Sequence, residues 1–250
     1  MSSTHSMKLV GKTIVITGGT SGIGYQLVSL LCPTNTVLVI ARPGARLENL
    51  KREFPRIETY GADLSKPEQY DALADSVLRD HPEIDLLINN AAIQHTPGFL
   101  DDDFSFEAIA HEINLNFTAV CSLSFLLLPA LLDEQRASSI VNINSGLGLV
   151  PKKASAVYCA TKGAMNLFSQ SLAYQLESSN VLVSQALLPL VETPMTTGRG
   201  SGKISAENAA IEIIAGIEMG VKVNNIGKVK LIRLLQAVAP WLIRRILKNG

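Results

Sequence analysis

Short runs of consecutive apolar residues alternate along the chain with longer segments in which apolar residues recur every three or four positions. Residues 12–17 are mostly β-branched and lead into glycines, as expected of a buried strand. From Gly22 the spacing becomes helical, and Pro33 ends it. The same alternation predicts further strands at 36–40, 57–60, 84–88, 139–143, 181–187 and 221–226. Helices are predicted at 46–54, 66–79, 106–132 and 156–177, from Ser205 onward, and through 229–247.

This alternation of strands and helices indicates the fold class. Strands that are apolar along their whole length are covered on both faces, and strands that alternate with helices are parallel. Right-handed crossovers then give a doubly wound sheet that binds ligands at the carboxyl ends of its strands. We therefore expect an α/β, Rossmann-type fold with about seven strands in three αβα layers. No repeat or linker divides residues 1–250, so we expect one domain, preceded by a flexible tail at 1–7.

Composition and charge exclude several classes of protein. Lys+Arg and Asp+Glu are both 22, so no net charge draws the chain to nucleic acid. The three cysteines, Cys32, Cys121 and Cys159, are widely spaced, which argues against a disulfide framework and fits a reducing compartment. The most apolar stretch, 119–132, is too short to span a membrane. No His, Cys and Asp residues have metal-ligand spacing. We expect a soluble, cytoplasmic protein without a metal site or a nucleic-acid partner.

A glycine-rich loop, TGGTSGIG at residues 17–24, separates the first predicted strand from the first predicted helix. Its glycines permit a tight turn and a close approach of a diphosphate to the backbone. At a helix N-terminus, free N–H groups and the helix dipole favour such an anion. The glycine spacing differs from the G-x-G-x-x-G fingerprint of dinucleotide-binding proteins. The position of the loop directly after the first strand strengthens its interpretation as a nucleotide-binding loop.

The ends of the second and third strands bear on the choice of nucleotide. An acid at the end of the second strand would bind a free ribose 2′-hydroxyl, whereas Ala41 here is followed by Arg42, whose guanidinium suits a 2′-phosphate. We therefore expect NADP(H) in preference to NAD(H); alternatively, Arg42 is a solvated loop charge. Asp63, after the third strand, could accept a hydrogen bond from the adenine amino group or only cap the turn before Lys66.

Tyr158 and Lys162 lie four residues apart at the start of a long predicted helix, so their side chains share one face. A free tyrosine has a pKa of about 10 and exchanges protons poorly at neutral pH. A neighbouring cation favours the phenolate and lowers the pKa. The pair suits a proton-transfer site; the alternative is an aromatic helix residue beside an exposed lysine.

Together these residues resemble the short-chain dehydrogenase/reductase superfamily, in its short, single-domain branch, over about residues 8–193. The matches follow the order of the family: residues 17–24, Asp63, NNAA at 89–92, Asn114, Ser145, Tyr158 and Lys162.

The resemblance implies a role for each matched residue. Tyr158 would be the general acid/base, and Lys162 would bind the nicotinamide ribose and lower the pKa of Tyr158. Ser145 would hold the substrate oxygen, or alternatively only end a strand. Asn114 would hold a water that relays protons from Lys162, or alternatively be a satisfied buried amide. The cofactor-binding residues implied are Gly18, Thr20, Ser21, Gly22, Ile23, Gly24, Arg42, Asp63, Leu64, Asn90, Ala91, Tyr158, Lys162, Val191 and Thr193.

The chain departs from the family pattern at three places. Ala92 and Phe117 stand where the family usually has glycine, and Phe117 is expected to crowd its helix turn. Residues 189–193 replace a common Pro-Gly pair with a less permissive backbone. These changes affect the shape of the pocket and leave the reaction class unchanged.

Residues 194–204 contain three glycines and are expected to form a flap over the substrate, or else an exposed linker. The expected pocket walls are mostly apolar, which favours an apolar carbonyl or alcohol substrate. These wall residues are Ile93, Gln94, His95, Leu147, Leu149, Leu190 and Met195.

The C-terminal region 229–250 combines leucines and Trp241 with lysines and arginines and has no acid. Such a basic amphipathic segment could pack on the core or on a second subunit, which we favour, or lie on an anionic membrane surface. The resemblance implies a homodimer or homotetramer. The leading function is an NADP(H)-dependent oxidoreductase acting on a carbonyl/alcohol pair. The alternatives are a non-catalytic NADP(H)-binding regulator or scaffold and a membrane-peripheral binding protein.

Overall fold

The computed structural model describes residues 6–248 of the chain. Residues 1–5 of the predicted tail, and the last two residues of the 229–250 region, therefore lie outside the described residues. Met7 belongs to the predicted tail but is buried, and its N–H donates to the carbonyl of Glu218 at 3.2 Å. At this position the expectation of a flexible tail is wrong, because the side chain joins the core.

Seven parallel strands form one sheet in the order β3-β2-β1-β4-β5-β6-β9, as in a doubly wound fold. The expected Rossmann-type fold is confirmed. β5 and β6 pair over eight positions, from Ser138↔Val181 to Ser145↔Leu188. The strands are β1 (Thr13–Thr17), β2 (Thr36–Ala41), β3 (Glu58–Gly61), β4 (Leu86–Asn89), β5 (Ser138–Ser145), β6 (Val181–Leu188) and β9 (Val223–Asn225).

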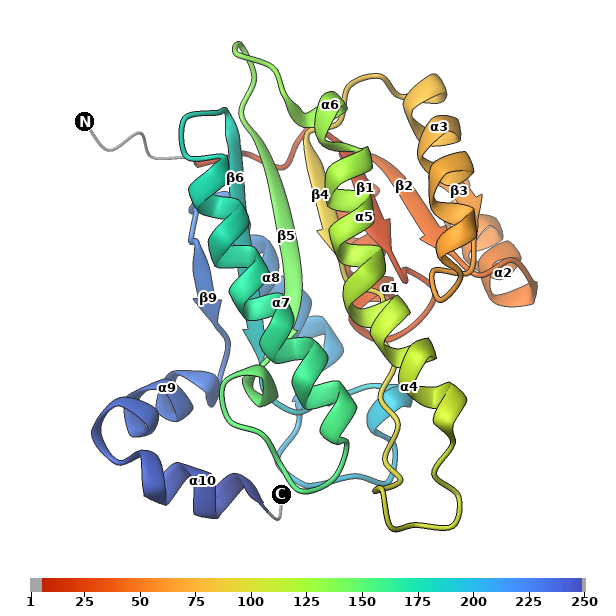
Figure 1. Ribbon diagram of the computed structural model, residues 1–250. Helices are drawn as coiled ribbons and strands as arrows, with labels where there is room; N and C mark the ends of the chain where they lie inside the picture. The colour runs from red at the N-terminus through yellow and green to blue at the C-terminus, as the bar shows by residue number, and fades with distance from the viewer. Residues whose placement is uncertain (1–5, 249–250) are drawn as a thin grey trace.

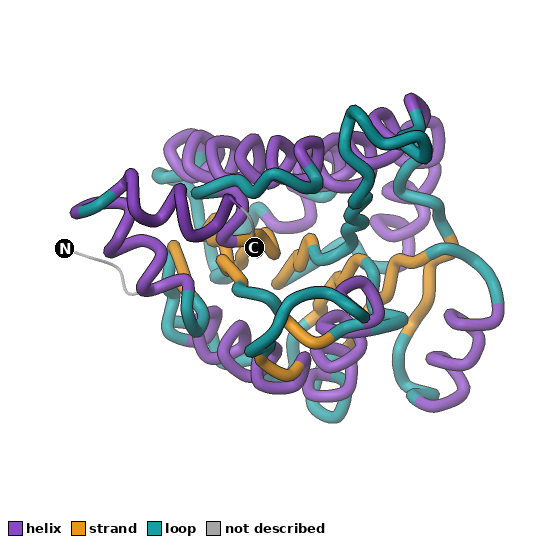
Figure 2. Tube along the Cα trace, turned by 90° about the horizontal axis from the view of Figure 1, so that it is seen from below, coloured by secondary structure: helices purple, strands orange, loops and turns teal. Residues whose placement is uncertain are grey.

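Helices cover both faces of the sheet, which Figure 2 shows as two rows of helices with the strands between them. The helices are α1 (Gly22–Leu31), α2 (Ala45–Glu53), α3 (Tyr70–Asp80), α4 (Phe106–Ile113), α5 (Ala119–Leu126), α6 (Leu128–Leu131), α7 (Ala156–Gln175), α8 (Ala206–Glu218), α9 (Val229–Val238) and α10 (Pro240–Lys248).

Alternation along the strands divides the apolar core between the two faces. Ile14 and Ile16 of β1 pack in one cluster with α1, α2 and α8, whereas Val15 packs in the other with α3 and α5. Successive side chains of a strand point to opposite faces, so a continuously apolar strand serves both layers.

The predicted helix at 106–132 is interrupted. A π-helical turn, η2 (Asn114–Thr118), separates α4 from α5, and α6 follows after Leu127. The predicted segment at 229–247 is likewise two helices, because Pro240 has no N–H to continue the ladder of α9. Among the described helices, none is both long and apolar enough to cross a membrane.

The carboxyl ends of the strands carry the remaining irregular segments. A two-stranded parallel sheet, β7 (Val191–Glu192) with β8 (Ile204–Ser205), joins the two ends of the predicted flap. Between them lie a 3₁₀ turn, η4 (Pro194–Thr196), and a glycine-rich loop. Another 3₁₀ turn, η3 (Gly146–Gly148), follows β5. In Figure 1, α9 and α10 lie at the lower left, below the end of β9.

Candidate active site

A cavity of about 1060 Å³ opens at the carboxyl ends of the strands. It runs from Arg42 after β2, past the glycine loop, to Ser145 after β5 and Tyr158 on α7. All fifteen residues expected to bind the cofactor line this main cavity, as do three of the four expected catalytic residues. The exception is Asn114. Tertiary structure therefore brings residues from position 18 to position 193 to one continuous surface.

The glycine loop is shaped for close contact with its neighbours. Gly18 has φ +73, and a Cβ there would lie 2.8 Å from the Cα of Ala91. The Asn90 side chain donates to the carbonyls of Thr17 and Gly18 at 2.9 and 3.1 Å. The Thr17 hydroxyl accepts from the N–H groups of Asn90 and Ala91, both at 2.9 Å. Asn90 and Ala91 thus hold the loop against the end of β4.

The first turn of α1 follows directly and has no side-chain cap on its N–H groups. Ser21, Gly22 and Ile23 line the main cavity at this point. Uncapped N–H groups at a helix N-terminus, beside a loop that tolerates no side chain at Gly18, fit a dinucleotide diphosphate.

The end of the main cavity that is expected to hold the adenosine carries two charged residues, Arg42 and Asp63. Arg42 is exposed, and both residues line the main cavity. The Asp63 carboxylate accepts from the Ser65 N–H at 3.1 Å and from the Ser65 hydroxyl at 2.7 Å, so it does cap its own turn. Burial alone would raise the pKa of Asp63, but these hydrogen bonds and the cations Arg42 and Lys66 outweigh it and lower the pKa. Asp63 is therefore ionised at neutral pH.

Ser145, Tyr158 and Lys162 meet at the opposite end of the main cavity. Ser145 ends β5, where its hydroxyl accepts from the N–H of Leu147 at 3.1 Å and hydrogen-bonds to Tyr158. Lys162 is 3% exposed, and its Nζ donates to the carbonyl of Ile143 at 2.9 Å. The same Nζ lies 5.7 Å from the centre of the Tyr158 ring. A helical i, i+4 pair thus faces the end of β5, as the spacing predicts.

The electrostatics of this pair differ from the expectation. Burial raises the pKa of Tyr158 to about 12, while the hydrogen bond with Ser145 acts in the opposite direction. Burial also lowers the pKa of Lys162 to about 8. Burial removes both side chains from water and therefore disfavours both the Tyr158 phenolate and the Lys162 ammonium. In the protein without a ligand, Lys162 therefore does not bring the pKa of Tyr158 below its usual value.

The two asparagines of the π-turn make different contacts. Asn114, the expected relay residue, is half-buried, and its side chain donates to the carbonyl of Ser65 at 3.2 Å. Asn116 is fully buried: its side chain accepts from the Ile93 N–H and donates to the Ile93 carbonyl, both at 2.9 Å. It also donates to the hydroxyl of Thr161, next to Lys162, at 3.3 Å. Asn116 is thus the asparagine that faces α7.

Phe117, expected to crowd its helix turn, lies within the π-turn. Its ring packs edge-on against Phe168 of α7, with ring centres 6.1 Å apart. One additional residue per turn rotates the helix by roughly a quarter of a turn, which changes the side chains facing α7. Asn116, and not Asn114, therefore has a side-chain hydrogen bond to α7.

The substrate end of the main cavity is lined by five of the seven expected wall residues, namely Ile93, Gln94, Leu147, Leu190 and Met195. The sequence did not point to Arg199 of the flap, whose guanidinium donates to the Gln94 side chain at 2.9 Å. It also missed Lys228, Ile232 and Leu247, which line the cavity from the C-terminal region. Nothing in their local sequence indicates this position.

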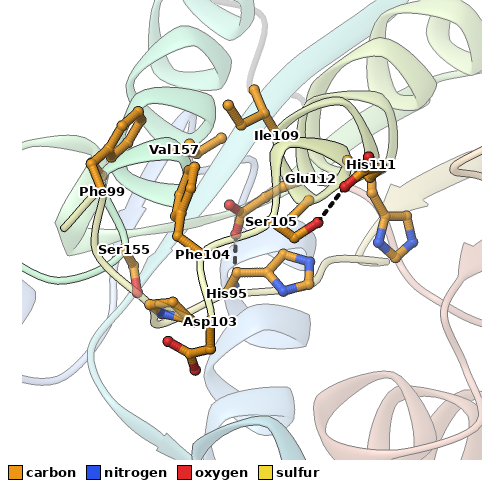
Figure 3. Close-up of a pocket in the computed structure, with 14 residues that line it drawn as sticks. His95, Phe99, Asp103, Phe104, Ser105, Ile109, His111, Glu112, Ser155 and Val157 are labelled. Atoms are coloured by element: carbon orange, nitrogen blue, oxygen red, sulfur yellow. Dashed lines mark hydrogen bonds between the residues drawn. The ribbon is translucent and has the colours of Figure 1, made fainter. Parts of the chain in front are cut away.

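His95 and Leu149 do not line the main cavity. His95 borders a separate side pocket of about 340 Å³, with Phe104, Glu112 and Ser155 (Figure 3). The buried Glu112 carboxylate accepts from the His95 N–H at 3.0 Å, which fixes the loop after β4. The backbone carbonyl of Leu149 accepts instead from Gln236 of α9.

Comparisons with known proteins agree with this geometry. The family model for short chain dehydrogenases matches residues 12–203. The uncharacterized oxidoreductase DltE of Bacillus subtilis (strain 168) is 37% identical over 188 residues, 75% of this chain and 74% of that protein. L-xylulose reductase of Bos taurus is 30% identical over 190 residues, 76% of this chain and 75% of that protein.

Solved structures share the fold. A short chain dehydrogenase from Burkholderia cenocepacia J2315 in complex with NADP superposes with a TM-score of 0.85 at 23% identity, covering 98% of this chain and 100% of that one. A short-chain dehydrogenase from Sphingobium yanoikuyae in complex with NADPH gives a TM-score of 0.78 at 26% identity, covering 92% and 95%. The chain belongs to the short-chain dehydrogenase/reductase superfamily and is an NAD(P)-dependent oxidoreductase that acts on CH–OH groups.

Proposed function

We propose that this protein is an NADP(H)-dependent carbonyl reductase/alcohol dehydrogenase in which Tyr158 transfers the proton. The observation that carries the proposal is the convergence of Ser145, Tyr158 and Lys162 at one end of the main cavity. The glycine loop and Arg42 lie at its other end. A dinucleotide held along this surface would bring its nicotinamide toward Tyr158, and the bound nicotinamide supplies or accepts the hydride.

Tyr158 acts as the general acid/base. With its pKa raised by burial, the phenol is protonated at neutral pH and can donate to a substrate carbonyl oxygen as that oxygen gains negative charge. The Ser145 hydroxyl holds the same oxygen and stabilises the developing charge. In the reverse direction, the phenolate accepts the alcohol proton. A bound ligand that brings charge or displaces water beside Lys162 changes the pKa of Tyr158, and with it the balance between proton donation and proton acceptance.

Proton resupply is assigned to Lys162 and Asn116, in place of the expected Asn114. The lowered pKa of Lys162, about 8, makes its ammonium a ready proton donor near neutral pH. Asn116 holds the segment around Ile93 against Thr161, the neighbour of Lys162. We assign to Asn116 the placement of the water path that leads from Lys162 to solvent.

The preference for NADP(H) rests on Arg42. β2 ends at Ala41 without a carboxylate, and the exposed guanidinium that follows is unhindered and suited to a 2′-phosphate. Structural relatives are known with NADP, with NADPH and with NAD, so likeness of fold does not choose between the two cofactors.

The substrate is proposed to be a small carbonyl or alcohol compound with an apolar body, because Ile93, Leu147, Leu190 and Met195 surround its expected position. Arg199 closes the flap over it through Gln94. Exposed apolar side chains on α5 and α7, such as Phe125 at 74% and Leu167 at 69%, support a homo-oligomer formed through these helices. A cytoplasmic location remains part of the proposal and follows from the sparse cysteines.

A nucleotide titration followed by a carbonyl panel tests the function. Wild type is expected to bind NADPH more tightly than NADH and to oxidise NADPH with at least one ketone or aldehyde. Tyr158→Phe should lose at least about a hundredfold in kcat while keeping its affinity for NADPH, because only the transferable proton is removed. Binding without turnover across the panel would favour the alternative, a cofactor-binding regulator. Unchanged turnover in Tyr158→Phe would refute the role of the tyrosine.

A further inference from the structure

The two C-terminal helices carry an unbalanced positive charge. No Asp or Glu follows Glu218 in the chain. Seven cations follow it, and all seven are exposed: Lys222, Lys228, Lys230, Arg233, Arg244, Arg245 and Lys248. Among the described residues, none of the seven forms an ion pair. The pair α9–α10, residues 229–248, is called the cationic hairpin below.

α9 has two apolar faces, and only one of them packs on the protein. Val229 is fully buried, and Ile232 lies against Gly146 at the rim of the main cavity. Leu231, Leu234 and Val238, spaced i, i+3 and i+7, form a second stripe that is 55%, 58% and 70% exposed. This spacing places the three side chains on one side of the helix, away from the buried face. The core therefore leaves this stripe uncovered.

α10 also exposes apolar and cationic side chains. Ile243 is buried, but Trp241, at 68% exposure, shares a helix face with Arg245 and Lys248, four and seven residues further on. A tryptophan among cations is typical of a surface that meets lipid headgroups, because the indole has an apolar body and a polar N–H. Ile246, five residues after Trp241, is 54% exposed on another side of the helix.

The charge pattern decides among the partners that could cover this surface. Interfaces between proteins are depleted of lysine at their cores, and two copies of a surface with only positive charges repel each other. A nucleic acid would neutralise the cations but would leave the Leu231–Leu234–Val238 stripe uncovered. Anionic lipid satisfies both requirements, since its headgroups attract the cations and its acyl boundary accepts the apolar side chains.

We propose that the cationic hairpin binds the surface of an anionic membrane, with the stripe of α9 and Trp241 in the headgroup region. The hairpin is well anchored for this purpose: the Lys248 carbonyl accepts from the Lys153 N–H at 2.8 Å, and Gln236 donates to the Leu149 carbonyl at 3.1 Å. Because Lys228, Ile232 and Leu247 line the main cavity, membrane binding holds the cavity rim beside the bilayer. The hairpin also lies beyond residues 12–203, which the family model matches. This inference does not depend on the reaction proposed above.

Trp241 is the single tryptophan of the chain, so its fluorescence reports on this surface alone. The full-length protein is titrated with vesicles of phosphatidylcholine containing phosphatidylglycerol, and with vesicles of phosphatidylcholine alone. Binding to the anionic vesicles should shift the Trp241 emission to shorter wavelength and carry the protein into the vesicle pellet. Salt at about 1 M, where the Debye length is about 3 Å, should weaken the binding.

Matched variants separate charge, apolar contact and folding. Arg233→Gln/Arg244→Gln/Arg245→Gln should weaken vesicle binding roughly a hundredfold, at about fivefold for each cation lost near the surface. Its control, Arg52→Gln/Arg56→Gln/Arg79→Gln, removes the same charge from exposed positions remote from the hairpin and should bind more than tenfold tighter than the hairpin variant.

A second pair of variants tests the apolar contact. Leu231→Gln/Leu234→Gln should abolish the Trp241 shift, whereas Ile211→Gln/Met219→Gln, at exposed positions on or next to α8, should not. Thermal melting of each variant establishes that it folds.

Three results would overturn the proposal. They are no binding of the wild type to anionic vesicles, equal binding to both kinds of vesicle, and equal losses in the hairpin variants and their controls. A Trp241 shift that grows with protein concentration without vesicles, together with self-association in sedimentation, would instead assign the surface to a second copy of the chain. NADPH binding by the same samples is read separately, so failure here leaves the proposed oxidoreductase function intact.

Discussion

Replacing Asn116 by alanine removes three side-chain hydrogen bonds from a fully buried position. The Thr161 hydroxyl keeps a partner, because it donates to the Tyr158 carbonyl at 2.8 Å. The N–H and carbonyl of Ile93 both lose theirs. Each polar group left without a partner costs about 1–3 kcal/mol, and Ile93 is only half-buried, so the expected loss is about 2–4 kcal/mol.

The matched substitution Asn114→Ala removes one side-chain hydrogen bond, to the Ser65 carbonyl, from a half-buried position. The expected loss is about 0.5–1.5 kcal/mol. For a chain of this length each kcal/mol corresponds to about 2–4 °C in melting temperature. Asn116→Ala should therefore melt about 5–15 °C below wild type, and Asn114→Ala no more than about 5 °C below it.

Activity is measured at a temperature at which both variants are folded. Asn116→Ala should lower kcat at least about tenfold, because the loop around Ile93 and the Thr161–Lys162 segment lose their connection. Asn114→Ala should stay within about threefold of wild type. A kcat that falls in Asn114→Ala and not in Asn116→Ala would refute the exchange of the two asparagines and restore the assignment made from the sequence.

Three further substitutions, one of them paired with a control, test other parts of the site. Arg42→Ala should weaken NADPH binding roughly tenfold to a hundredfold, the loss of one charge-assisted contact, and leave NADH binding nearly unchanged; equal losses for both nucleotides would contradict the 2′-phosphate assignment. Because burial lowers the pKa of Lys162 from 10.5 to about 8, the unfolded chain binds more protons between these values, so this lysine makes stability rise with pH across that window. Urea unfolding at a series of pH values should show a smaller rise in Lys162→Met, and an identical pH dependence would argue against a buried lysine. Gly24→Ala should abolish nucleotide binding, since the new methyl group would overlap the Gly18 carbonyl, whereas Gly163→Ala, which meets nothing closer than 3.7 Å inside α7, should raise stability by about 0.5–1 kcal/mol in thermal melting.

Hydrophobic patterning by itself determined the fold class, the number of strands in the main sheet and most element positions. Continuously apolar strands such as β1 and β2 identify a sheet covered on both faces, because no other arrangement buries both sides of every strand. The glycine loop and the Tyr158–Lys162 pair were also recognisable in the sequence. Both depend only on residue type and on spacing within a short segment: glycines allow a tight turn, and an i, i+4 pair shares one face of a helix.

Only the tertiary structure decided which asparagine contacts α7 beside Lys162, because that choice depends on the π-turn. The turn is associated with contacts between Asn116 and Ile93, which lie 23 positions apart in the chain. Tertiary structure likewise decided the electrostatics, since burial overrides the local proximity of Lys162 to Tyr158. It also placed Arg199 and the C-terminal residues at the main cavity. The physical reason is common to all three: patterning reports what a segment can bury, whereas a side chain's neighbours and its exposure to water depend on segments distant in sequence.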